Sequence, residues 1–198
     1  MNPATALPDA LPAVPPGQRL RGRLQLILIL AVVIGPMILA SAMYQWRFWV
    51  PETRSYHGEL IGTGQTRVDL GVVGAEESRW QLLVTVPDVC DAACKELIFL
   101  ARQIHIGLNR DTARASHALA SAQPLAPDYD AELHREYPQL SRYQLQLPAY
   151  GEIAGEAKGA QLWIVDPRGN LVLRYDATSK GKAILNDLRH LLKISQIG

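Results

Sequence analysis

The longest apolar run of the chain lies near its N-terminus, at residues 24–44. These 21 residues include no charged side chain, and at about 1.5 Å per residue a helix of this length crosses a hydrocarbon core of about 30 Å. Four aromatic residues lie at the end of this run and just beyond it, as is typical of the interface between membrane and water: Tyr44, Trp46, Phe48 and Trp49. The pattern therefore predicts a single transmembrane helix over residues 24–44, embedded in a lipid bilayer.

The segments on either side of this run predict its orientation. Residues 1–23 contain five prolines among small residues and have little to bury, so we predict a flexible tail. Three arginines directly precede the apolar run, whereas two lie in residues 45–57, which we interpret as a juxtamembrane linker. Because cytoplasmic flanks carry the larger number of Lys and Arg residues, we expect the tail in the cytoplasm and the following domain across the membrane.

A cleaved signal peptide is the alternative interpretation, because Ala40-Ser41-Ala42 resembles a cleavage site. The apolar run is longer than the usual core of a signal peptide, and the aromatic residues after it suit a retained anchor. We therefore favour an uncleaved anchor.

From residue 58 onward, short strand-like and helical patterns alternate. Residues 80–86 are mostly apolar, which predicts a strand covered on both faces. Apolar residues then recur every three or four positions from Asp91 to Leu108, which predicts an amphipathic helix. Periodicity and turn residues further predict a β-hairpin at 59–72, a strand within 113–121, a short helix at 129–137, a strand-like segment at 142–147, a glycine-rich loop at 148–159, a β-hairpin at 161–175 and an amphipathic helix at 180–194.

Cys90 and Cys94 are the only cysteines, and they lie where the strand at 80–86 gives way to the next helix. On a helix, residues four apart share a face with about 6 Å between their Cα atoms, near the upper end for a disulfide. A bond is therefore easiest if Cys90 is the N-cap, with non-helical torsions. The positive end of a helix also favours the thiolate, which attacks disulfides and binds Cu(I). A structural disulfide and two buried thiols remain equally open on this geometry.

A cysteine pair at the junction of a central strand and a helix matches the thioredoxin-like architecture. The order of elements predicts one domain over residues 58–198, with a helix on each face of a mixed sheet. The predicted fold class is therefore α/β, with a thioredoxin-like mixed sheet flanked by helices and preceded by one transmembrane helix. Two cysteines do not make a disulfide scaffold, so the domain requires a conventional core.

Charge is balanced, with 20 Lys and Arg residues against 19 Asp and Glu residues. No basic cluster lies in the C-terminal two-thirds of the chain, so we expect no nucleic-acid partner. Three of the five histidines have patterns that predict ordinary roles. We expect His57 to be a solvated linker residue, His105 to be half-exposed on its helix and His190 to be exposed on the last helix.

Three features together resemble the Sco family of cytochrome c oxidase assembly proteins: the Cys-x-x-x-Cys pair after the first core strand, the Asp166-Pro167-Arg168-Gly169 turn and the Leu-rich closing helix. The resemblance implies a single-pass protein of the bacterial inner membrane with a thioredoxin-like domain in the periplasm. It implies respiratory oxidase subunits or copper chaperones as partners and copper as a possible cofactor. It also implies that Cys90 and Cys94 are the catalytic residues and the candidate copper ligands.

The chain departs from the Sco pattern in two places. Asp91 and Lys95 stand where the family carries prolines after the cysteines. The family also supplies a histidine as a third copper ligand shortly before the strand that enters the Asp-Pro turn. Here residues 153–161 contain no histidine, and Lys158 lies about where it would fall. A three-ligand copper site would therefore need His117 or His134.

Three functional hypotheses follow. The leading one is thiol-disulfide exchange in oxidase assembly, in which Cys90 attacks a partner disulfide and Cys94 resolves the mixed disulfide. The second is Cu(I) delivery by the same two thiolates. The third is a non-catalytic assembly scaffold, in which the pair forms only a structural disulfide.

Overall fold

The structure is a computed structural model of the chain, and it describes residues 16–46, 56–62, 64–155 and 159–195. The chain divides into two compact units, residues 1–53 and 54–198. The predictions for residues 1–15 and for most of the linker lie outside the described residues, as do Phe48 and Trp49 of the aromatic cluster.

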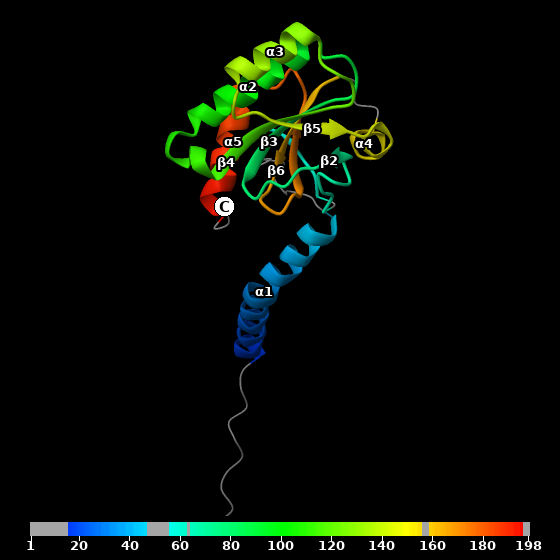
Figure 1. The fold of residues 1–198 in the computed structure, drawn as a ribbon. Coiled ribbons are helices and arrows are strands. Elements are labelled where there is room, and N and C mark those ends of the chain that lie inside the picture. The colour runs from blue at the N-terminus through cyan, green and yellow to red at the C-terminus, as the bar shows by residue number, and fades with distance from the viewer. Residues whose placement is uncertain (1–15, 47–55, 63, 156–158, 196–198) are drawn as a thin grey trace, which may run out of the picture. The chain divides into compact units, whose positions relative to one another are not determined.

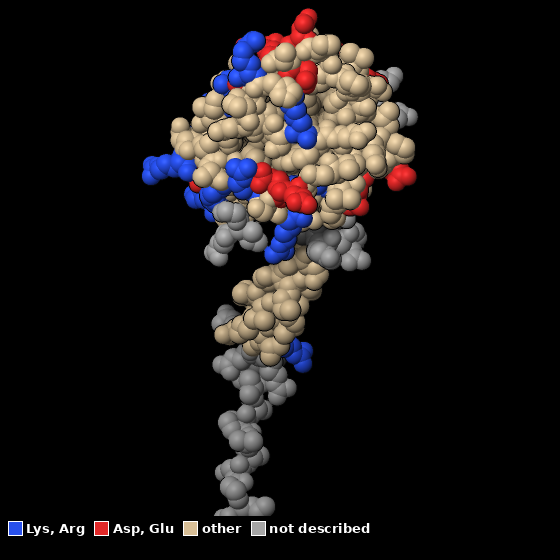
Figure 2. All heavy atoms as spheres, viewed as in Figure 1, with Lys and Arg blue, Asp and Glu red and all other residues tan. Residues whose placement is uncertain are grey.

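The described part of the N-terminal unit is one helix, α1 (Pro16–Trp46). Its segment Gly22–Ala42 is long and apolar enough to cross a membrane, and none of it is buried against protein. The surface of this segment is almost free of charge (Figure 2). The helix begins at Pro16, within the stretch predicted as a flexible tail, because proline fits the first turn, where its missing N–H has no partner to lose. The candidate membrane span overlaps the predicted one.

The C-terminal unit is built on a seven-stranded sheet with the strand order β1-β7-β6-β3-β4-β5-β2. The strands are β1 (Glu59–Leu60), β2 (Val72–Val73), β3 (Trp80–Val86), β4 (Ala115–Ser121), β5 (Ser141–Leu145), β6 (Gln161–Val165) and β7 (Leu171–Tyr175). β3, β4 and β5 run parallel to one another, and the remaining pairings are antiparallel. The sheet is therefore mixed, as predicted.

Helices cover both faces of this sheet (Figure 1). They are α2 (Ala92–Gly107), α3 (Pro127–Glu136), α4 (Leu147–Ala154) and α5 (Gly181–Ile194), with a 3₁₀ helix, η1 (Asn109–Arg114), between α2 and β4. β3 is buried along its whole length, and its alternate side chains Leu82 and Leu83 belong to two different cores. The larger core packs α2, α3 and α5 against the sheet, and the smaller one packs α4. The α/β, thioredoxin-like class is confirmed.

Two predicted elements are wrong. The segment 59–72 is not a hairpin, because β1 pairs with β7 and β2 pairs with β5 at opposite edges of the sheet. The intervening residues bond instead to the turn after β6, with the Arg67 amide donating to the Gly169 carbonyl at 2.8 Å. The predicted loop at 148–159 contains most of α4. Pro148 lies in the first turn of this helix, where proline is tolerated.

The elements around the cysteine pair are confirmed: β3, α2, β4, α3, β5, the hairpin of β6 and β7, and α5. In the hairpin turn, Asp166 Oδ1 accepts hydrogen bonds from the Arg168 and Asn170 amides, both at 2.8 Å. Gly169 has φ +89°, a left-handed conformation that favours glycine. Local turn chemistry thus explains why this hairpin could be read from sequence.

Candidate redox site

The junction between β3 and α2 positions the two cysteines. Asp91 is the N-cap of α2, and its side chain accepts a hydrogen bond from the Cys94 amide at 2.9 Å. The N-cap is therefore Asp91 and not Cys90, the position considered easiest for a disulfide, because a carboxylate is a much better acceptor than a thiol for the free amides of a first turn. Cys90 lies just before the N-cap, and Cys94 is the third residue of the helix.

Cys90 and Cys94 form a disulfide, with their Cα atoms 5.2 Å apart. The distance is shorter than regular helix geometry predicts, because Cys90 lies outside the helix. Cys94 is fully buried in the larger core, whereas Cys90 is half-buried. An approaching molecule therefore meets Cys90 first.

The charges near the pair have both signs. Asp88 and Asp91 are exposed, and Lys95 follows Cys94. The Lys95 ammonium lies 4.5 Å from the centre of the Tyr129 ring, which joins the first turns of α2 to α3. Because Asp91 already occupies the positive end of α2, a thiolate of the reduced pair shares the helix dipole with a carboxylate.

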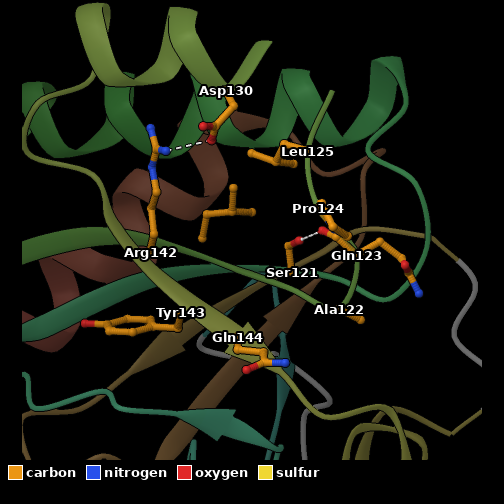
Figure 3. Close-up of a pocket in the computed structure, with 10 residues that line it drawn as sticks. Ser121, Ala122, Gln123, Pro124, Leu125, Asp130, Arg142, Tyr143 and Gln144 are labelled. Atoms are coloured by element: carbon orange, nitrogen blue, oxygen red, sulfur yellow. Dashed lines mark hydrogen bonds and ion pairs between the residues drawn. The ribbon is translucent and has the colours of Figure 1, made fainter. Parts of the chain in front are cut away.

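A pocket of about 350 Å³ opens at the carboxyl ends of β4 and β5 (Figure 3). Arg142 and Asp130 form an ion pair at 2.7 Å on one side of it, and the Ser121 hydroxyl donates to the Gln123 carbonyl on the other. Its lining also includes Leu119, Ala122, Pro124, Leu125, Tyr143 and Gln144.

This pocket and the disulfide lie at the same end of the sheet, where the parallel strands have their carboxyl ends. Ser121 pairs with Val86, the last residue of β3, and the Ala122 amide donates to the Val86 carbonyl at 3.0 Å. Open α/β sheets bind ligands beyond the carboxyl ends of their strands. The end of the sheet that carries Cys90 therefore also has a pocket that can admit part of a partner molecule.

The structure does not bring the candidate third ligands to the cysteines. His117 lies on β4, with its ring centre 4.9 Å from that of His105 near the far end of α2. His134 lies on α3, where it contacts Arg142 and Asp130. Among the described residues, no three His, Cys, Asp or Glu side chains are grouped to hold a metal ion. A three-ligand copper site therefore does not fit this part of the chain; Lys158 lies outside it.

The predicted exposure of His105 is wrong. Only 6% of this residue is exposed, because its Nε2 lies 3.0 Å from the Ala115 carbonyl and 3.2 Å from the Thr112 carbonyl. Both oxygens are acceptors, so Nε2 carries the proton and donates. The exposure of His190 is confirmed.

Asp187 on α5 is a buried acidic residue that the sequence reasoning missed. Its carboxylate accepts hydrogen bonds from the backbone amides of His57 and Gly58, at 2.7 and 3.2 Å, and from the Tyr175 hydroxyl, at 2.8 Å. The exposed His57 ring also lies 2.8 Å from it through Nδ1, so His57 is paired as well as solvated. Burial, and after it the hydrogen bond to Asp187, raises the pKa of Tyr175. An acidic residue within the apolar stripe of the helix was the signal available in the sequence.

Comparison with known proteins gives two matches to family models. Residues 80–195 match the C-terminal domain described as transmembrane-like and thioredoxin-like, and residues 16–47 match the transmembrane-like N-terminal domain. No curated protein matches the chain.

Several solved structures are similar to the chain at low identity. Copper-bound ScoI of Arabidopsis thaliana is 10% identical, with a TM-score of 0.43, covering 58% of this chain and 86% of its own. A putative thiol:disulfide interchange protein DsbE from Chlorobium tepidum is 8% identical, with a TM-score of 0.44 and coverages of 60% and 82%. A putative thioredoxin from Neisseria meningitidis is 9% identical, with a TM-score of 0.45 and coverages of 65% and 81%.

Proposed function

The chain belongs to the transmembrane-like, thioredoxin-like family, and on that premise we propose that it is a membrane-anchored thiol-disulfide exchange protein acting through Cys90 and Cys94. The observation that carries the proposal is the placement of the disulfide. The bond joins a half-buried cysteine to a fully buried one at the junction of the central strand and α2.

This placement gives the two sulfurs different roles. In the reduced protein, the Cys90 thiolate attacks a partner disulfide, forms a mixed disulfide and releases one partner thiolate, which takes a proton from solvent. The buried Cys94 then loses its proton and attacks the Cys90 sulfur. This step closes the Cys90–Cys94 bond and releases the second partner thiolate. Two electrons pass to the partner, and the reverse sequence oxidises a partner dithiol.

The size of the disulfide loop supports exchange over a purely structural bond. The bond joins residues four apart and closes a ring of five residues. By loop-closure entropy, so small a ring stabilises a fold by only about 2 kcal/mol, less than a bond that closes a long loop. The first turn of α2 is also held independently by the Asp91 cap.

A finer part of the proposal concerns place and partner. We propose that the N-terminus is cytoplasmic, that the C-terminal unit faces the periplasm of a bacterial inner membrane, and that the exchange serves assembly of cytochrome c oxidase. The arginines directly before the apolar run support the orientation, and the Cys-x-x-x-Cys spacing supports the oxidase pathway. Oxidase subunits or copper chaperones with paired cysteines would be the substrates. Copper would be cargo at most, held as Cu(I) by the two reduced thiolates.

Trapping tests the exchange chemistry in the full chain expressed in membranes. In Cys94→Ser, the mixed disulfide on Cys90 has no resolving thiol, so we expect reductant-sensitive adducts on non-reducing gels. Cys90→Ser and the double variant serve as matched controls and should show none. Absence of adducts from both single variants, together with normal oxidase assembly in the double variant, would favour the scaffold.

Competition with a chelator for Cu(I) tests the cargo alternative. The reduced full chain is titrated in detergent beside Cys90→Ser. Tight one-to-one binding that is lost in the variant would support copper delivery, and equal weak retention by both proteins would argue against it.

A further inference from the structure

Two pockets flank the far end of α2. The larger, of about 630 Å³, is bounded by the start of β4, η1 and Arg79; we call it the η1 pocket. The smaller, of about 260 Å³, lies between the last turns of α2 and the residues after α3. His105, His117 and Gln139 line both pockets, so these three side chains form the wall between them.

His117 in this wall is buried without a hydrogen-bond partner. Only 3% of the residue is exposed, and neither ring nitrogen is bonded to any described group. Buried polar groups in folded proteins are nearly always paired, because leaving one unpaired is costly. A neutral imidazole always carries one N–H, so His117 offers an unused donor at the pocket wall.

The neighbouring His105 cannot serve as a second donor. Its Nε2 proton is used by the Ala115 and Thr112 carbonyls, which fixes the ring and leaves Nδ1 as an acceptor. The ring contact at 4.9 Å then holds His117 in place. The two histidines have distinct roles, and only His117 has an N–H to give.

The charges around this wall favour an anion over a metal ion. Arg79 and Arg110 line the η1 pocket, which includes no Asp or Glu in its lining. The Arg79 guanidinium is already paired with the Glu77 carboxylate at 2.8 Å, so the attraction for an anion comes from Arg110. Arg102 approaches from the smaller pocket, where its guanidinium lies 4.9 Å from the centre of the Tyr137 ring. Burial, then the neighbouring His105 and Arg102, lower the pKa of His117 to about 4. The ring is therefore neutral at pH 7, and the surroundings oppose further positive charge.

We propose that the η1 pocket binds a small oxyanion, a carboxylate or phosphate group, which accepts the ring N–H of His117 and is attracted by Arg110. The site is separate from the cysteine pair. His117 precedes Ser121 by four residues, so it lies about 13 Å along β4 from the end of the sheet that carries the disulfide.

Calorimetric titration of the oxidised full chain in detergent tests the site, with inorganic phosphate in one series and succinate in the other. We expect one of the two anions to bind at one equivalent, which identifies the source of the oxyanion. His117→Leu should weaken binding at least tenfold, because leucine has no donor, while the fold should persist, since the change removes an unpaired polar group. His134→Leu, on α3 outside both pockets, is the matched control and should bind normally.

A second variant, Arg110→Gln, tests the proposal even if His117→Leu does not fold. Arg110 is exposed, so Arg110→Gln should fold normally and should weaken binding of the anion several-fold. Arg168→Gln, in the β6–β7 turn, is the matched control and should leave binding unchanged. Failure of both anions to bind, or equal binding by His117→Leu, would overturn the proposal. NMR spectra in which Zn²⁺ shifts the His117 ring resonances and neither anion does would also overturn the proposal, because they would indicate a cation site.

Discussion

Reduction of the Cys90–Cys94 bond is expected to destabilise the C-terminal unit only modestly. The bond closes a ring of five residues, and the loop-closure expression gives about 2 kcal/mol of stabilisation at 25 °C. No second large loss should follow. The freed Cys94 thiol still packs as a small apolar group, and the Cys94 amide keeps its 2.9 Å bond to Asp91.

Equilibrium urea unfolding of the full chain in detergent measures this difference. Near-ultraviolet circular dichroism follows the packing of Trp163, which is fully buried in the smaller core. With a slope of about 2 kcal/mol/M, a loss of about 2 kcal/mol lowers the midpoint by about 1 M and leaves the slope unchanged. Cys90→Ser lacks the bond under both conditions, so adding reductant should leave its midpoint where it was.

A much larger loss of stability on reduction would contradict this expectation. If reduction costs more than about 4 kcal/mol, or removes cooperative unfolding, the bond supports the fold far beyond its loop entropy. The scaffold with a structural disulfide would then explain the pair better than exchange. A small effect is what a protein must show if its disulfide opens and closes in each cycle.

Two further predictions concern charged groups away from the cysteines. Asp187→Leu should lower the free energy of unfolding by about 3–5 kcal/mol in the same urea assay, because the Tyr175 hydroxyl and two backbone amides lose their acceptor; Asp187→Asn keeps an oxygen and should cost less. Burial alone would raise the pKa of Glu77, but hydrogen bonds from Arg79 and Ser116 outweigh it and lower the pKa to about 2. The ionised Glu77 therefore adds up to about 1 kcal/mol to the free energy of unfolding above pH 4.5, and this contribution is lost as the pH falls toward 2. Urea unfolding of Glu77→Gln at several pH values should lack this part of the pH dependence.

Hydrophobic spacing along the sequence determined the elements that carry the candidate redox site. Residues 80–86 formed a strand buried on both faces, and the three-to-four spacing after Asp91 formed α2. The Asp166 turn and the apolar stripe of α5 were equally local signals. Each depends on contacts between residues a few positions apart, so the pattern alone was enough to place the cysteines between a central strand and a helix.

Tertiary structure decided the features that depend on distant parts of the chain. β1 and β2 join opposite edges of the sheet, and no local pattern in 59–72 distinguishes this from a hairpin. His105 and His117 meet because α2 packs on β4, and Asp187 is bonded by His57, 130 residues away. Burial and partnership of a polar side chain are properties of the packed chain, since the groups that remove its water come from elements remote in sequence.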